Sequence, residues 1–239
     1  LLVPVDAVHG HAYIDGATVF PHNLGMAATR NPDLVERGGA VTGVETAATG
    51  ASLNYGPTAD VARDQRWGRV FETYGESSYL CGELAAAEAR GLRGEDADPT
   101  VGVTAKHFPA YGQPSRGEDA SVVDVSESTL RRAFLPQFER LIDEGVDVVM
   151  PCYNAIDGQP AHGSRRFLQE YLREDLGFDG TIVSDWHGVQ MLHQNHRVAA
   201  DHRGSVRLTR EAGLDIASVD ATDHAEHYHS LVEEGELSE

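Results

Sequence analysis

Short apolar runs alternate with amphipathic stretches along this chain. The apolar runs fall at residues 1–5, 51–55, 101–105, 146–150, 181–184 and 214–217. Short runs with little polar alternation are typical of strands that are covered on both faces, as in parallel sheets. Because helical patterns separate these runs, the sequence predicts the α/β class.

The intervening stretches carry the signals of helix ends. Helices are predicted at residues 31–50, 126–144 and 164–177. Asn31 stands before Pro32 as a cap before a first-turn proline. Ser164 stands at the start of the third helix, and Gly177 lies just past its end. Pro136 falls inside the second helix, where its missing N–H predicts a kink.

Six parallel strands fit either an open doubly wound sheet or most of an eight-stranded barrel. Neither a Pro/Gly/Ser-rich linker nor a run of like charges interrupts the chain, and 239 residues is the size of one large α/β-barrel domain. We therefore expect residues 1–239 to form one domain.

The net charge of the chain disfavours some classes of binding partner. With 38 acidic and 19 basic side chains the formal net charge is −19, a field that repels nucleic acid and anionic lipid. No apolar stretch reaches the roughly 18 residues that span a bilayer. We expect neither nucleic acid nor a membrane as a partner.

The basic residues are almost all arginine, since Lys106 is the only lysine. Acid-rich, lysine-poor surfaces are typical of proteins dissolved in concentrated salt, where the repulsion between carboxylates is screened. A halophilic origin is one interpretation, and an ordinary acidic protein is the other.

Polar side chains gather where the predicted strands end. They are Asp6 and His9, Lys106 and His107, Tyr153 and Asn154, and Asp185 and Trp186. Any one of these could be a structural residue, but four strand ends in a row favour an active site, because barrels and open α/β sheets place their sites there.

The residue types at these strand ends suit a polyhydroxylated substrate. Carboxylate, ammonium and imidazole groups form charge-assisted hydrogen bonds with hydroxyls, and Trp186 offers an apolar face to a sugar ring. Asp185, just beyond a buried strand, has the character of a nucleophile. Retaining glycoside hydrolysis needs a second carboxyl group about 5–5.5 Å away, and the sequence presents no obvious candidate for it.

Several longer motifs point to one family. They are residues 5–10 (VDAVHG), 16–21 (GATVFP), 63–69 (RDQRWGR), 72–76 (ETYGE), 105–108 (AKHF), 153–158 (YNAIDG), 184–186 (SDW) and 211–215 (EAGLD). In this order they resemble the N-terminal barrel of glycoside hydrolase family 3, in its β-glucosidase branch. The resemblance implies a (β/α)8 TIM-type barrel that is incomplete at one or both ends here.

The resemblance also implies roles for individual residues. Asp185 would be the nucleophile that forms a covalent glycosyl-enzyme, with Trp186 beside it against the sugar and Tyr153 near it. The hydroxyls of a terminal glucose would be held by Asp6, Arg69, Lys106 and His107.

The activity that the resemblance implies is that of a retaining, exo-acting β-glucosidase on β-glucosides or oligosaccharides. In this branch the acid/base glutamate comes from a following α/β sandwich domain, which is not part of residues 1–239. The barrel's first strand is also expected upstream of Leu1. The chain opens on that leucine rather than a methionine, so we make no prediction of its compartment.

Three details bear on the branch. Gln65 stands where the family usually has proline, which we expect to be a minor loop change. Residues 109–120 hold none of the histidine that the N-acetylglucosaminidase branch uses as its acid/base. The β-xylosidase branch commonly has cysteine after the nucleophile, where this chain has Trp186, so β-linked glucose is favoured.

Two other functions stay open. A lysine at a strand end next to a histidine could attack a carbonyl, which would make the protein a Schiff-base lyase that uses Lys106. A catalytically incomplete sugar-binding barrel, without an acid to assist departure of the leaving group, is the third interpretation.

We expect no cofactor and no metal. The chain has none of the Gly-rich loops that bind phosphates, and we interpret His224, His227 and His229 as surface-helix residues. Cys81 and Cys152 lie far apart in the sequence and are expected to be free, buried thiols.

Lys106 and His107 present a geometric difficulty, because adjacent residues of a regular strand point to opposite faces. Both can face one substrate only if the backbone is irregular. We therefore predict a bulge or a non-trans peptide bond between Ala105 and Pro109.

Overall fold

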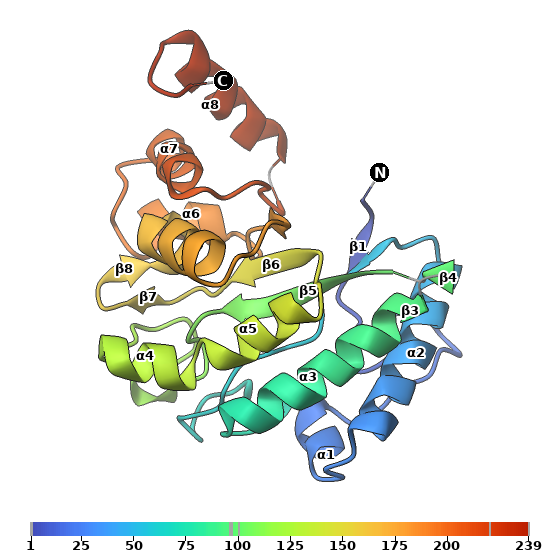
Figure 1. Ribbon diagram of the computed structural model, residues 1–239. Helices are drawn as coiled ribbons and strands as arrows, with labels where there is room; N and C mark the ends of the chain where they lie inside the picture. The colour runs from blue at the N-terminus through green and yellow to red at the C-terminus, as the bar shows by residue number, and fades with distance from the viewer. Residues whose placement is uncertain (1, 96–97, 100, 220, 239) are drawn as a thin grey trace.

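The computed structural model describes residues 2–95, 98–99, 101–219 and 221–238. Its centre is a parallel five-stranded sheet, drawn with its covering helices in Figure 1. The strands, in spatial order, are β1 (Pro4–Val5), β2 (Leu53–Asn54), β5 (Gly102–Phe108), β6 (Val148–Pro151) and β9 (Thr181–Ile182). Strand order therefore follows chain order, as in a barrel, whereas a doubly wound sheet reverses direction at a switch point.

Most of the predicted strands are confirmed. Five of the six apolar runs contribute a strand to the sheet, although several strands are shorter than predicted. The exception is 214–217, where the described residues make a single parallel bridge, between Ile216 and Val183. The α/β class is confirmed.

Helices follow the strands along the chain and lie outside the sheet (Figure 1). They are α1 (Asn23–Ala27), α2 (Pro32–Ala48), α3 (Ser78–Arg93), α4 (Glu127–Ala133), α5 (Pro136–Asp143), α6 (Gly188–Gln194), α7 (His202–Ala212), α8 (Ala221–Glu233) and the π-helical segment η4 (Arg166–Asp175). Two small antiparallel hairpins, β3 (Gly94–Glu95) with β4 (Asp98–Pro99) and β7 (Ala155–Ile156) with β8 (Gln159–Pro160), lie outside the main sheet.

The helix predictions hold with one correction. Asn31 caps α2 by accepting a hydrogen bond from the Leu34 amide at 3.2 Å. The single kinked helix predicted over 126–144 is wrong: the chain forms two helices, and Pro136 is the first residue of α5. Proline is compatible with a helix start because it has no N–H to lose there, so the chain ends one helix and begins another.

Two hydrophobic clusters lie on the two faces of the sheet. Val149 belongs to the large core beneath the helices, whereas its neighbours Val148 and Met150 belong to a small cluster with Leu53 and Val183. Alternate residues of β6 therefore face opposite sides. The small cluster lies on the face of the sheet opposite the large core, and Met150 of this cluster also lines the cavity described below.

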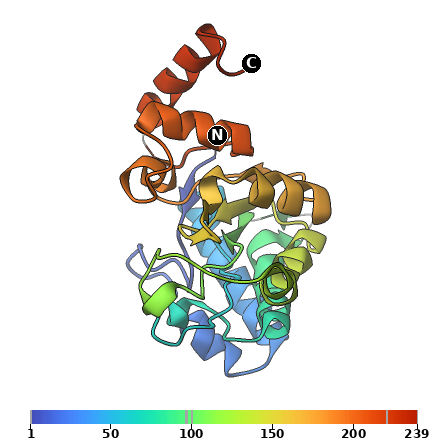
Figure 2. The same ribbon diagram turned by 90° about the vertical axis from the view of Figure 1, so that its left-hand side faces the viewer.

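α7 and α8 extend from the rest of the molecule, and α8 lies farthest out (Figures 1 and 2). Leu231 of α8 is fully buried in the core. In the described part of the chain no helix is both long and apolar enough to cross a membrane. Cys81 and Cys152 are free and buried, as predicted.

Candidate active site

A cavity of about 330 Å³ opens at the carboxyl ends of the strands. All five strands reach its wall within a few residues of their ends, the usual position of sites in α/β barrels. Six of the predicted site residues line it: Asp6, Arg69, Lys106, His107, Asp185 and Trp186. Tyr153 joins them through its hydroxyl, which donates a hydrogen bond to Asp185 Oδ1 at 2.9 Å.

Asp185 follows β9 and is held from several sides. Its Oδ1 accepts hydrogen bonds from the Tyr153 hydroxyl at 2.9 Å and from the Trp186 amide at 2.6 Å. Its Oδ2 is buried, has no hydrogen-bond partner and lies 3.6 Å from His107 Nε2. One oxygen of the carboxyl group is therefore fixed by two donors, and the other, although buried, has no hydrogen bond to hold it.

Burial raises the pKa of Asp185 above the usual aspartate value. The Trp186 amide, the Lys106 ammonium and the Tyr153 hydroxyl act in the opposite direction, because each stabilises the carboxylate. Burial also raises the pKa of Tyr153, and the neighbouring Asp185 charge adds to this shift, so the phenol stays a donor.

The backbone around Lys106 and His107 is irregular, which confirms the prediction. The register of β5 against β6 shifts between Lys106 and Phe108. The Lys106–His107 peptide bond is cis, and so is the bond between Phe108 and Pro109. Both Lys106 and His107 line the same cavity.

Lys106 of β5 and Asp6, just after β1, form an ion pair at the wall of the cavity. Lys106 Nζ lies 2.6 Å from Asp6 Oδ1. The Lys106 side chain is 3% exposed, whereas that of Asp6 is 48% exposed. The ammonium group is thus buried at the wall of the cavity, and the carboxylate stands at its opening.

His107 is supported by a buried carboxyl group. Asp60 lies 2.8 Å from His107 Nδ1 through Oδ2 and accepts a hydrogen bond from the His107 amide through Oδ1 at 3.2 Å. Burial raises the pKa of Asp60 to about 8 and lowers that of His107 well below its usual value. The pair therefore shares a proton between Asp60 and Nδ1, which leaves Nε2 directed to Asp185 and Arg69.

Arg69 is fixed by a planar contact. Its guanidinium makes a bidentate pair with Glu72, with both distances 2.7 Å, and also donates to the Tyr111 hydroxyl at 3.1 Å. Burial opposes the charge of Arg69, but the Glu72 pair outweighs it and raises the pKa of Arg69. The Arg69 guanidinium therefore stays positively charged at the cavity wall.

Aromatic side chains form the rim of the cavity. Trp186 is 65% exposed and Tyr13 is 68% exposed, although both line the cavity. Large apolar faces at the entrance of a polar cavity suit the C–H face of a sugar ring.

Sequence reasoning missed several residues of the site. The most important are Asp60, His162 and Ser218, because each contacts His107 or Asp185 directly. Asp60 had only a weak signal, since it comes six residues after the end of β2, whereas Asp6 directly follows β1. His162 and Ser218 had none, because their positions depend on the path of the loops after β8 and after the Ile216 bridge.

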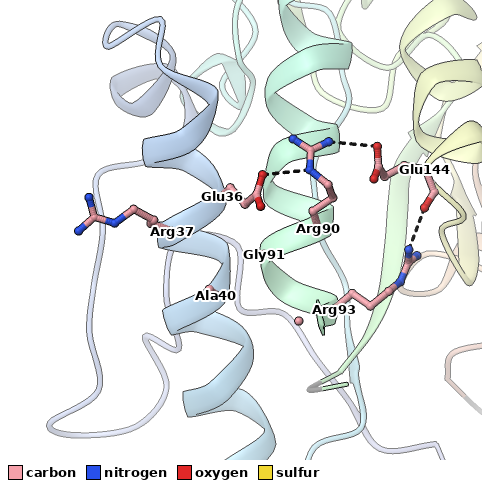
Figure 3. A pocket seen from close by; sticks show the side chains of 8 residues that line it. Glu36, Arg37, Ala40, Arg90, Gly91, Arg93 and Glu144 are labelled. Carbon is pink, nitrogen blue, oxygen red and sulfur yellow. Dashed lines mark hydrogen bonds and ion pairs between the residues drawn. The ribbon is translucent and has the colours of Figure 1, made fainter. Parts of the chain in front are cut away.

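The structure contains a larger hollow elsewhere, of about 590 Å³, between α2, α3 and the end of α5 (Figure 3). Arg90 bridges Glu36 and Glu144 there at 2.9 and 3.1 Å. None of the predicted site residues lies in it. Its ion pairs join neighbouring helices.

No group of three or more His, Cys, Asp or Glu side chains within the described ranges is arranged to hold a metal ion. Of the three histidines noted near the end of the chain, His227 lies 3.5 Å from Asp223 and His229 lies 3.3 Å from Glu233. Both pairs join residues one helical turn apart on α8.

Comparison with known proteins gives a consistent result. The family model described as the glycosyl hydrolase family 3 N terminal domain matches residues 1–239. The chain is 33% identical to a lysosomal beta glucosidase of Dictyostelium discoideum, over 92% of this chain and 28% of that protein. It is 38% identical to a beta-xylosidase of Formosa agariphila, over 88% of this chain and 31% of that protein.

Solved structures agree with this result. A beta-glucosidase from Listeria innocua in complex with isofagomine superposes with a TM-score of 0.93 and is 32% identical, over all of this chain and 33% of that one. A beta-glucosidase involved in saponin metabolism from intestinal bacteria gives a TM-score of 0.94 at 33% identity, over all of this chain and 32% of that one. The fold is thus of the TIM-barrel type, and the chain spans about a third of the length of these relatives.

Proposed function

The chain belongs to glycoside hydrolase family 3, and we propose that it is the nucleophile-bearing domain of a retaining, exo-acting β-glucosidase. The observation that carries the proposal is the state of the Asp185 carboxyl group. One oxygen is held by Tyr153 and Trp186, and the other is unpartnered at a cavity that bears two fixed cations, Arg69 and Lys106.

In the proposed reaction Asp185 Oδ2 attacks the anomeric carbon of a terminal glucose. The glycosidic C–O bond breaks as the Asp185–carbon bond forms, and the leaving oxygen receives a proton from an acid. Water then attacks the anomeric carbon and gives a proton to the same group as base, and the Asp185 carboxylate departs. Arg69 and Lys106 favour the ionised carboxylate that the first step requires.

The sugar would be held by groups already fixed in place. Lys106 and Asp6 present a donor and an acceptor to neighbouring hydroxyls, and His107 and Arg69 present further polar groups on the same wall. Because their partners Asp60 and Glu72 hold these two side chains, little conformational entropy is lost when sugar binds.

The acid/base group belongs to a part of the enzyme outside this chain in our proposal. The relatives are about three times as long as this chain, which leaves room for the α/β sandwich domain that the resemblance implies. Within the cavity wall the carboxyl groups are Asp6 and Asp185, and Asp6 is paired with Lys106. An acid that must protonate a leaving group is poorly served by a carboxylate bound to an ammonium ion.

The test is covalent trapping. The chain, alone and within the natural protein that contains it, is incubated with 2-deoxy-2-fluoro-glucosyl fluoride, and the labelled peptide is mapped by mass spectrometry. We expect the label on Asp185 in the natural protein and none in Asp185→Asn. Efficient hydrolysis of an activated aryl glucoside but not of cellobiose by the isolated chain would support an acid supplied from elsewhere.

The preference between substrates is tested with the same two proteins, the chain alone and the natural protein that contains it. Because relatives include β-xylosidases, aryl glucoside and aryl xyloside are compared by kcat/KM. We expect the glucoside to be preferred, and a preference for the xyloside would overturn the glucosidase assignment while leaving the nucleophile intact.

A Schiff-base lyase remains the second candidate, since Lys106 is a buried amine at a strand end. Its ion pair with Asp6 speaks against this function, because an ammonium has no lone pair with which to attack a carbonyl. Borohydride trapping of a carbonyl substrate on Lys106, with no label on Asp185, would favour the lyase. Sugar binding with neither label would favour a non-catalytic barrel.

A further inference from the structure

The backbone of Asp185 is bound by a histidine side chain. The Asp185 amide donates a hydrogen bond to His162 Nε2 at 3.0 Å. His162 is 2% exposed and lies in the short turn Ala161–Gly163 that follows β8. An imidazole nitrogen that accepts from an amide must be unprotonated, so the ring proton must sit on Nδ1.

The surroundings of His162 keep it in that state. Burial is the main cause that lowers its pKa to about 3, and the neighbouring His196 contributes to the same shift. A hydrogen bond with the backbone of Cys152 acts in the opposite direction. His162 therefore remains a neutral acceptor across the range in which glycosidases work.

Packing fixes the ring at this position. A Cβ atom on Gly188, at the start of α6, would lie 2.3 Å from His162 Nε2, so glycine alone leaves room for the ring. His162 also lies beside the Tyr153 ring, with 6.2 Å between the ring centroids and 29° between the ring planes. Since Tyr153 donates to Asp185 Oδ1, His162 binds the backbone of Asp185 and lies beside the side chain that orients its carboxyl group.

The rest of the Asp185 backbone is held as well. Ser218 Oγ donates to the Asp185 carbonyl at 3.1 Å, and Ser184 Oγ in turn accepts from the Ser218 amide at 2.9 Å. The peptide groups on either side of Asp185 are thus anchored to two different loops. Oδ2 is the polar atom of the residue left without a partner.

We propose that His162 is a positioning residue for the nucleophile: as a neutral acceptor of the Asp185 amide and a support for Tyr153, it aims Oδ2 at the anomeric carbon. This inference rests on the proposed function. The proposed role concerns the distance between Asp185 Oδ2 and the anomeric carbon. A displacement of the attacking atom by about 1 Å lowers the rate by on the order of 100-fold.

The experiment compares variants of His162 in the natural protein that contains this chain. His162→Leu removes the acceptor at similar volume, and His162→Gln offers an amide oxygen in its place. His11→Leu is the matched control, because His11 is also buried, at 3% exposure, and binds Thr49 rather than Asp185. The readouts are the rate of labelling by 2-deoxy-2-fluoro-glucosyl fluoride and the dissociation constant for glucose.

We expect His162→Leu to be labelled about 100-fold more slowly, with glucose affinity changed by no more than about threefold. His162→Gln should recover at least about tenfold of the lost rate, and His11→Leu should be labelled as fast as wild type. Equal labelling rates in wild type and His162→Leu would overturn the inference. An equal loss of labelling rate in His162→Leu and His162→Gln would mean that His162 has only a structural role, and this result would also overturn the inference.

Two further measurements keep the inference testable if His162→Leu does not fold. Gly188→Ala retains the imidazole but displaces it from the Asp185 amide, so its labelling rate should fall as in His162→Leu. Nitrogen-15 spectra of the His162 ring should show the Nδ1–H form from pH 5 to 8, and protonation of that ring near pH 6.5 would contradict the inference without any activity assay. Failure of wild type to label Asp185 would instead refute the proposed function.

Discussion

The hydroxyl of Tyr153 holds the same Asp185 oxygen as the Trp186 amide, so the two donors share the task of stabilising the carboxylate. Burial raises the pKa of Asp185, and these donors, with Lys106 and Arg69, counteract that rise. The nucleophile must be ionised to attack. Its working pH range is therefore set by how much of this stabilisation is present.

Tyr153→Phe should make the acid limb of the kcat/KM profile move to higher pH. Without the phenol hydroxyl the pKa of Asp185 rises further, so the ionised fraction at a given acidic pH falls. We also expect kcat/KM at the optimum to fall by about 10- to 100-fold, as a charge-assisted hydrogen bond of ~1.5–3 kcal/mol is lost. A pH–rate series measures both effects.

Tyr171→Phe is the control, because Tyr171 donates to Glu127, away from the cavity. That variant should keep the wild-type profile. An unchanged acid limb in Tyr153→Phe would mean that the hydroxyl does not stabilise the ionised nucleophile.

The site residues that the sequence predicted lie at strand ends or in motifs, where position in the fold follows from position in the chain. Asp185, Lys106 and His107 are of this kind, and even the irregular backbone followed from the alternation of side chains along a strand. His162 could not be predicted, because its contact with Asp185 depends on a hairpin and on the room left by Gly188. Loop geometry of this kind leaves no periodic signal.

Helices α2 and α3 approach each other closely because small residues face each other at their contact. A Cβ atom on Gly91 would lie 2.0 Å from the Glu36 carbonyl oxygen and 2.7 Å from the Ala40 amide nitrogen, both backbone atoms of α2. Figure 3 shows Gly91, Glu36 and Ala40 beside the hollow between the two helices. The contact was not predicted, since α3 itself was not among the expected helices.

Gly91→Ala should destabilise the protein, because two backbones must separate to admit the methyl group. Overpacking of this kind costs about 1–3 kcal/mol, partly offset by the ~1 kcal/mol gain in helix propensity. Gly38→Ala on α2 is the matched control, because its Cβ would meet only the flexible end of Met26 at 3.3 Å. Urea unfolding of both variants measures the difference, and equal stabilities would show that the helix pair tolerates separation.

Elements were predicted correctly where burial imposes a pattern of apolar residues on the sequence. The prediction was wrong where local backbone chemistry determines where a helix begins or ends. The buried runs of β5 and β6 could be assigned from apolar content alone. The division between α4 and α5 could not, because Pro136 is equally compatible with a kink inside a helix and with a helix start. Which occurs depends on how the flanking Phe134 and Leu135 pack, and both are buried.

Buried titrating groups make the stability of the whole molecule depend on pH. Glu88 is buried, accepts a hydrogen bond from the Tyr74 hydroxyl, and has its pKa raised by burial to about 7. Between about pH 4.5 and 7 Glu88 ionises in the unfolded chain but stays protonated in the folded one. The free energy of unfolding of the protein therefore falls as pH rises through this range.

Glu88→Gln should therefore gain stability relative to wild type as pH rises through that window. Glutamine can still accept from Tyr74 and does not ionise, so the two proteins should be nearly equal at pH 4. At pH 8 the variant should be more stable by up to about 3 kcal/mol, the equivalent of the shift. Unfolding free energies at several pH values measure the gap. A constant gap would show that Glu88 does not titrate with a raised pKa.

The net charge of −19 on 239 residues acts on the whole surface and cannot be assigned to one contact. Carboxylates separated by more than the Debye length, about 8 Å at 0.15 M salt and 3 Å at 1 M, cease to repel one another as salt is added. Ion pairs such as Arg131 with Asp175 weaken for the same reason, but exposed pairs contribute only about 0–1 kcal/mol each. Twice as many acidic as basic groups means that repulsion dominates the balance.

We therefore propose that the protein is adapted to salt and expect its Tm to rise by at least about 4 °C between 0.1 and 2 M KCl, roughly 1 kcal/mol for a domain of this size. Sucrose at matched osmolality is the control, because it favours compact states through exclusion from the surface without screening charge. A rise with KCl that clearly exceeds the rise with sucrose would assign the effect to screening. A Tm that is flat in KCl would make the acidic surface that of an ordinary mesophilic protein, and the scarcity of lysine would then need another cause.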